Sequence, residues 1–152
     1  MRLPYGEGTW FAVPLRSGGY GVGGVARSTA EGKVILGYFF GPRRQRVPTL
    51  VDVFSLRPDQ AVAALRFGDL GLIQGEWPVL GQATGWRRSE WRMPEFVRTE
   101  PITNRSFRVR YSDADPNQVL EEEPMSRPEP RLTRDSLLGA GALEVTLSRL
   151  LA

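Results

Sequence analysis

A segment rich in glycine places the strongest constraint on the fold of this chain. Residues 20–26 read YGVGGVA, so glycine occupies alternate positions of an otherwise strand-like run. A glycine inside a strand has no side chain to pack, and it often marks a sharp bend or the close approach of another group. Residues 20–26 therefore predict a sheet that bends sharply or is closely covered on one face.

Two further strand-like segments flank this one. Residues 10–15 precede it after a turn at residues 17–19, and residues 34–40 follow it and end at Gly41-Pro42. Consecutive strands joined by short glycine-containing turns are typical of an antiparallel meander. The first three elements are therefore predicted to form one.

The rest of the chain mixes strand and helix signals. Residues 49–54 predict a fourth strand, and residues 58–65 predict a short helix that begins with proline and stops before Gly68. Residues 107–111, FRVRY, alternate with period two, which places Phe107, Val109 and Tyr111 toward the core.

These signals indicate an α+β fold: a strongly bent antiparallel sheet or a partly open small β-barrel with one short helix and one C-terminal helix. Residues 1–123 are predicted to form the main domain, and residues 124–132 a proline-rich spacer. Residues 133–152 predict an amphipathic helix that packs on the same domain or on a partner. A chain of 152 residues buries enough surface for one such core.

Composition excludes many kinds of chemistry. The chain contains no histidine and no cysteine, so Ser-His-Asp and Cys-His catalysis, zinc fingers, Fe–S clusters and His-ligated haem are excluded. No metal and no cofactor are expected. The absence of both residue types makes a binding protein the favoured class over an enzyme. The start of the chain has no apolar signal-peptide core and no segment is apolar enough to span a membrane, which together predict a cytoplasmic protein.

Three carboxylates lie among apolar neighbours, where burial would raise the pKa: Asp52, Asp69 and Glu76. The alternative, which we favour, is that they stabilise turns by accepting backbone hydrogen bonds. The run D-x-D-x-N at residues 113–117 lacks the glycine and distal glutamate of a calcium loop, so a turn is favoured there too.

A basic segment with two tryptophans is the main candidate for partner contact. The candidates are Trp86, Arg87, Arg88, Trp91 and Arg92 in this segment, with Asp113, Asp115, Glu121, Glu122 and Glu123 as a complementary acidic patch. Tryptophan and arginine are enriched in protein-binding hot spots. The same residue types stack on nucleic acid bases, and both tryptophans would equally suit a core covered by arginine stems.

Several segments, in order, resemble the bacterial immunity protein 26 family. They are GTWFAVPL with GYGVG (residues 8–23), LGYFFGP (36–42), GDLGLI with WPVLG (68–81), and Trp86, Trp91 and MPEF (93–96). The resemblance covers about residues 8–123. It implies an immunity protein that binds and neutralises a cognate secreted polymorphic toxin by stoichiometric protein–protein interaction.

The same family label also covers a small phosphotriesterase, so the resemblance leaves a hydrolase as an alternative, beside a nucleic-acid-binding domain. A phosphotriesterase of the familiar type with two metals needs histidine ligands that this chain lacks. A site built from Asp and Glu alone stays open, but no D-x-D or E-x-x-E spacing on a single helix supports it. The net charge of +3 disfavours a nuclease toxin with a cationic groove as the partner. The acidic patch weakens the argument against such a toxin, because it could itself attract a cationic surface.

Overall fold

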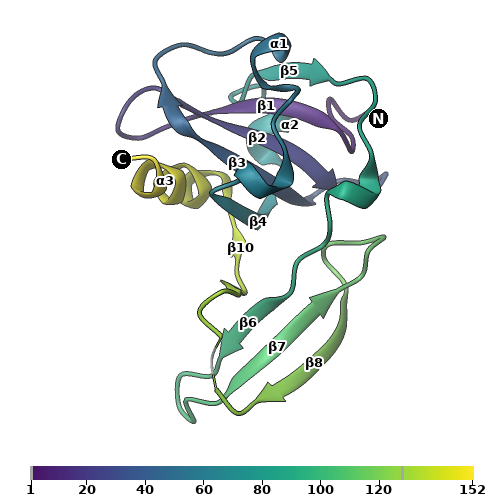
Figure 1. Ribbon diagram of the computed structural model, residues 1–152, viewed down its shortest axis with the longest axis vertical. Coiled ribbons are helices and arrows are strands. Elements are labelled where there is room, and N and C mark those ends of the chain that lie inside the picture. The colour runs from purple at the N-terminus through teal and green to yellow at the C-terminus, as the bar shows by residue number, and fades with distance from the viewer. Residues whose placement is uncertain (1, 128) are drawn as a thin grey trace.

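The computed structural model describes residues 2–127 and 129–152, which form two β-sheets and three α-helices. The larger sheet has the strand order β10-β4-β3-β2-β1-β5, and the smaller has the order β8-β7-β6-β9. Figure 1 shows the two sheets as two lobes joined by extended chain. The predicted α+β class with a bent sheet is confirmed, and the described strands do not close into a barrel.

The large sheet is built on the predicted antiparallel meander. Its strands are β1 (Thr9–Pro14), β2 (Tyr20–Arg27), β3 (Val34–Arg44), β4 (Ala63–Gly68), β5 (Val79–Gln82) and β10 (Leu137–Leu138). Strands β1 to β4 pair in sequence order and antiparallel, while β5 returns to the far side of β1. Every strand of the meander therefore lies beside its neighbour in the chain.

The glycines of β2 let aromatic rings lie directly on the sheet. A Cβ at Gly23 would lie 2.5 Å from Cζ of Phe11 and 2.8 Å from the Phe39 ring. On the opposite face, Gly24 lies under the indole of Trp10. The predicted close cover is therefore present, and it is present on both faces of the strand.

The C-terminal helix α3 (Ala140–Leu150) covers one face of the large sheet (Figure 1). Leu143 and Leu147 are fully buried in the same cluster as Phe11 and Phe39. Glu144 accepts a hydrogen bond of 2.9 Å from Nε1 of Trp77. The helix begins at Ala140, later than predicted, because residues 133–134 and 137–138 form the short strands β9 and β10.

Two local predictions were wrong. Residues 49–54 do not form a strand: α1 (Leu50–Val53) begins there, because the Asp52 carboxylate accepts hydrogen bonds from the amide and the hydroxyl of Thr49 (2.8 and 3.0 Å). Residues 58–65 do not form a helix either. A single 3₁₀ turn, Pro58–Gln60, leads into β4, whose pairing along β3 overrides the local helix preference.

The end of β3 also differs from the prediction. The strand continues through Gly41-Pro42 to Arg44, which lies opposite Tyr20 of β2. An irregularity in the register between Tyr20 and Val22 accommodates the proline, which has no amide hydrogen for the ladder.

The small sheet extends away from the large one. It consists of β6 (Phe96–Thr99), β7 (Ser106–Tyr111), β8 (Val119–Met125) and β9 (Thr133–Arg134). Val109 and Tyr111 are buried as predicted, in a second core cluster with Trp10 and Phe40 of the large sheet. Phe107 is only half-buried, beneath the guanidinium of Arg98. This second cluster therefore joins the two lobes, whereas the cluster around Phe11 contains no described residue of the small sheet.

The remaining helix is the single turn α2 (Leu70–Ile73). Among the residues that the structure describes, none of the helices has the length and apolar character needed to cross a bilayer.

Candidate functional site

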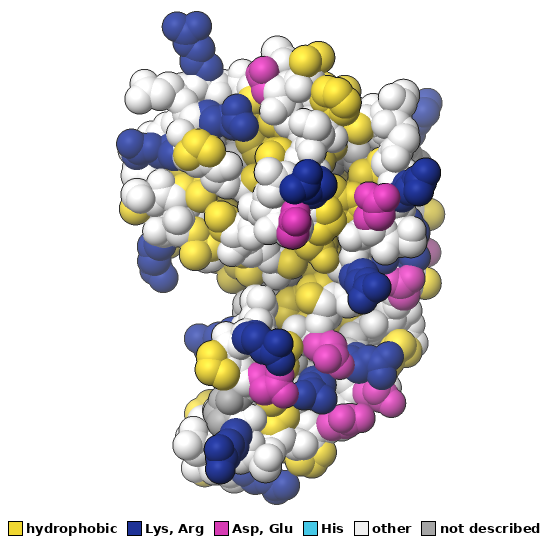
Figure 2. Space-filling model, in the orientation of Figure 1, with side chains coloured by type: hydrophobic (Ala, Val, Ile, Leu, Met, Phe, Trp, Pro, Cys, Tyr) yellow, Lys and Arg dark blue, Asp and Glu magenta, His cyan; other side chains and the backbone are white. Residues whose placement is uncertain are grey.

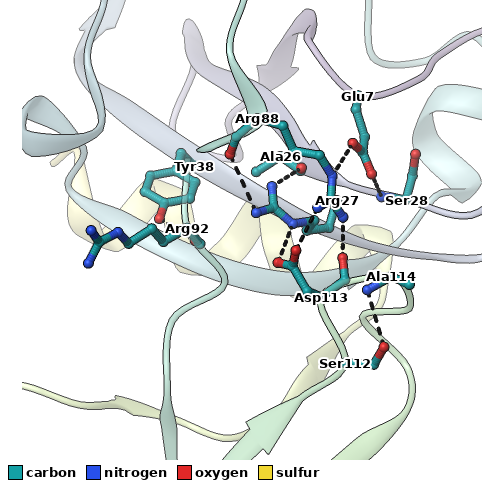
Figure 3. Close-up of polar contacts among 10 residues, drawn as sticks. All are labelled: Glu7, Ala26, Arg27, Ser28, Tyr38, Arg88, Arg92, Ser112, Asp113 and Ala114. Carbon is teal, nitrogen blue, oxygen red and sulfur yellow. Dashed lines mark hydrogen bonds and ion pairs between the residues drawn. The ribbon is translucent and has the colours of Figure 1, made fainter. Parts of the chain in front are cut away.

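A buried arginine at the end of β2 organises the junction between the lobes (Figure 3). Arg27, whose side chain is 4% exposed, donates from Nε to Oδ1 of Asp113 at 2.9 Å and from a terminal nitrogen to the carbonyl of Ala26 at 2.7 Å. Arg88 binds the same Asp113 carboxylate and donates to Glu7 at 2.8 Å. Arg88 and Asp113, predicted in opposite patches, are therefore partners of each other.

The charge of Asp113 is stabilised by this arrangement. The hydrogen bond from Arg27 is the largest cause that lowers the pKa of Asp113, and Arg88 lowers it further against an opposing effect of burial. A carboxyl group with a lowered pKa in the folded state stabilises the fold only while it is ionised.

We therefore expect the stabilising effect of Asp113 to depend on pH. Above the ordinary carboxyl pKa of 3.8, wild type should be more stable than the Asp113→Asn variant. As the pH falls through the lowered folded-state pKa, the difference should shrink to the loss of hydrogen bonding alone, because the wild-type carboxyl is then neutral too. Urea denaturation of both proteins between pH 7 and pH 2 measures this difference. A constant difference across that range would contradict it.

A second buried arginine joins the lobes from β4. Arg66 donates from Nε to the carbonyl of Pro116 at 2.8 Å, and from Nη1 to the hydroxyl of Tyr111 at 2.7 Å and to Asp135 at 3.2 Å. Its guanidinium also lies 3.8 Å from the centroid of the Tyr111 ring. Burial raises the pKa of Tyr111, so its hydroxyl stays protonated and donates to Asp135 at 2.7 Å.

Sequence reasoning missed both Arg27 and Arg66. Each is a single charge at or near the end of an apolar strand, in the runs GGVAR and AALRF. Because a charge that is buried is almost always paired, such a lone arginine is a usable signal for a structural ion pair.

The acidic patch is largely paired within the chain. Glu121 contacts Arg110 at 2.5 Å and Glu122 contacts Arg98 at 3.2 Å. Glu123 lies directly opposite Arg108 in the register of β7 and β8, and Asp115 accepts a hydrogen bond of 2.9 Å from the amide of Asn117. Figure 2 accordingly shows basic and acidic side chains interspersed over the small-sheet lobe.

The two tryptophans of the basic segment differ in their surroundings. Trp91 is buried and packs edge-to-face on Trp10, with ring centroids 5.8 Å apart, so the core interpretation holds for it. Trp86 is half-buried beside Gly8. Arg87 and Arg92 are exposed and form no ion pair with any described residue, although the carbonyl of Arg92 accepts a hydrogen bond from Tyr38 (Figure 3).

Trp86 and Arg87 line a surface groove of about 150 Å³ that is open to solvent. Its opposite wall is the chain that leaves α1, residues 54–58, and its floor includes Trp91. Phe54 on that wall is 50% exposed, and the neighbouring Val51 of α1 is 76% exposed. This wall was not foreseen, because residues 49–54 were predicted to be a strand.

Two of the three carboxylates that lie among apolar neighbours in the sequence stabilise turns. Asp52 is exposed, and the backbone hydrogen bond from Thr49 lowers its pKa. Asp69 accepts hydrogen bonds from the Tyr5 hydroxyl at 2.7 Å and the Lys33 amide at 2.9 Å, and Glu76 is exposed. The favoured interpretation is therefore confirmed for Asp52 and Asp69. In the described residues, no three acidic side chains are grouped in a way that would hold a metal ion.

These features define a small α+β protein with an internally paired acidic patch and an open groove of apolar and arginine side chains. Residues 6–108 match the family described as immunity protein 26, and the chain belongs to that family. Membership identifies it as an immunity protein and confirms the predicted resemblance. No similar curated protein and no similar solved structure was found.

The match ends within β7, so β8, β9, β10 and α3 lie outside it. The division of the chain at residues 123 and 132 stays a prediction.

Proposed function

We propose that this protein binds a cognate toxin in the cytoplasm and neutralises it by forming a stoichiometric complex. The groove at residues 54–58 and 83–91 is the observation that carries the proposal. It exposes a phenylalanine and part of a tryptophan beside Arg87, which has no ion-pair partner among the described residues. Aromatic and arginine side chains of this kind supply most of the binding energy at protein interfaces.

Three other residues predicted to contact a partner help to hold the groove in place. Arg88 and Asp113 tie the basic segment to the lobe junction and so position the groove, while their side chains stay 40% and 63% exposed. Trp91 forms the floor of the groove from the core side. A rigid, preformed surface loses less conformational entropy on association than a flexible one, which favours tight binding.

The test begins by examining the gene immediately upstream for a toxin domain and then measures protection from that domain. Cells that express this domain are expected to survive when the protein is co-expressed, and the purified components are expected to form a complex of fixed stoichiometry by light scattering. A toxin domain from an unrelated locus is the control and should still kill. Protection without a complex, accompanied by chemical conversion of the toxin or its product, would contradict stoichiometric neutralisation.

A further inference from the structure

Unpaired positive charge gathers on one side of the large-sheet lobe. Arg43, Arg44 and Arg46 follow one another at and just beyond the end of β3, and none forms an ion pair within the described chain. Figure 2 shows basic side chains predominating on the left of the large-sheet lobe, with an acidic side chain near its top, whereas both signs are mixed over the small-sheet lobe. Together with Arg87 these arginines outnumber the unpaired acidic residues described in this region, Asp52 on α1 and Glu90 in the groove, so its net charge is positive.

Exposed apolar side chains lie next to this charge. Val47, Val51 and Phe54 are 39%, 76% and 50% exposed, in and around α1. Arg46 and Val47 come just before Thr49, the residue that caps α1, so the end of the basic run adjoins the helix along the chain. We call the patch formed by Arg46, Val47, Val51, Phe54 and Arg87 the α1 surface. Two of its members, Phe54 and Arg87, also line the groove.

We infer that the toxin surface covered by this protein is acidic, with an apolar side chain that enters the groove of the α1 surface. The inference rests on the proposed function and restricts the partner to toxins with an acidic surface. A toxin that presented a cationic nucleic-acid-binding groove here would meet like charge, which opposes association. An acidic rim around an apolar centre would instead pair with the arginines and bury Phe54 and Val51.

Pairing within the small sheet weakens the argument for a cationic partner. Of the acidic patch, Glu121 and Glu122 contact arginines of neighbouring strands, whereas Asp115 and Glu123 form no ion pair within the described chain. Asp113 lies between Arg27 and Arg88. Only part of the acidic patch therefore remains unpaired to set against the α1 surface.

The experiment uses the purified toxin domain encoded beside this gene and isothermal titration calorimetry with the full-length protein. Arg87→Glu and Phe54→Ala are each expected to raise the Kd at least tenfold at low salt. The effect of Arg87→Glu should shrink as salt rises, because exposed charges are screened. Two matched controls on the small-sheet lobe, Arg127→Glu and Ile102→Ala, should change the Kd less than twofold, and circular dichroism confirms the fold of each variant.

Three results would overturn the inference, and they differ in what else they imply. Tight wild-type binding that both groove variants leave unchanged would place the toxin elsewhere and leave the proposed function intact. No wild-type binding would reject the proposed function together with the inference. Micromolar binding of a single-stranded RNA 20-mer at physiological salt, abolished by Arg87→Glu, would assign the α1 surface to nucleic acid instead.

Discussion

Replacing Arg66 with methionine is expected to lower the free energy of unfolding by about 3–5 kcal/mol, because removing one partner of a buried ion pair leaves the other charge uncompensated. The Arg66 side chain is 6% exposed and that of Asp135 is 12% exposed. The substitution would leave Asp135 with only its hydrogen bond from Tyr111, and the carbonyl of Pro116 would lose its donor.

Chemical denaturation monitored by fluorescence measures this loss. Arg110→Met is the matched control, because Arg110 forms its ion pair with Glu121 at the surface, where both side chains are about half exposed. Exposed pairs contribute about 0–1 kcal/mol. Equal effects of the two substitutions would show that the Arg66 cluster does not hold the lobes together.

Leu147→Ala is expected to destabilise the protein by about 2–5 kcal/mol, the usual cost of truncating a fully buried leucine. Leu147 is 0% exposed and packs in the core cluster with Phe11 and Phe39, although α3 lies outside the residues that match the family. A loss of this size is a large share of the 5–15 kcal/mol by which a domain of this kind is stable.

Leu150→Ala on the same helix is the control for this prediction. Leu150 is 48% exposed, so its truncation should change stability by less than about 0.5 kcal/mol. Thermal unfolding of wild type and both variants measures the two changes in stability. If Leu147→Ala behaved like Leu150→Ala, α3 would be an appendage that contributes little to the core.

The sequence-based predictions succeeded where a local pattern has only one structural solution. The glycines of residues 20–26 predicted a sharp bend or close cover of the sheet, and Phe11, Phe39 and Trp10 supply the close cover. The alternation in residues 107–111 placed Val109 and Tyr111 in the core, because successive side chains of a strand point to opposite faces.

They failed where short segments suit more than one structure. Residues 49–54 have the apolar composition of a strand, but hydrogen bonds between Thr49 and Asp52 begin a helix there. Residues 63–65 have good helix propensity, yet pairing with β3 satisfies their backbone in the sheet. Propensities of a few tenths of a kcal/mol per residue cannot outweigh such tertiary contacts.

For the candidate site, too, some features could be predicted from the sequence and others depend on the fold. Composition and spacing identified the basic aromatic segment, because residue type alone shows which side chains suit an interface. Only the fold decides which of them are free. Trp91 packs into the core and Arg88 is held by Asp113, which lies 25 residues away in the sequence, while Arg87 stays exposed.

The sequence by itself determined the α+β class, the β1–β3 meander and membership of the immunity protein 26 family, because these depend on periodicity, glycine positions and the order of motifs. The tertiary structure alone decided the lobe junction, the internal pairing of the acidic patch and the groove beside α1. Each of these depends on contacts between residues far apart in the chain. Such contacts are set by how the two sheets pack around their shared core, and local sequence does not encode that packing.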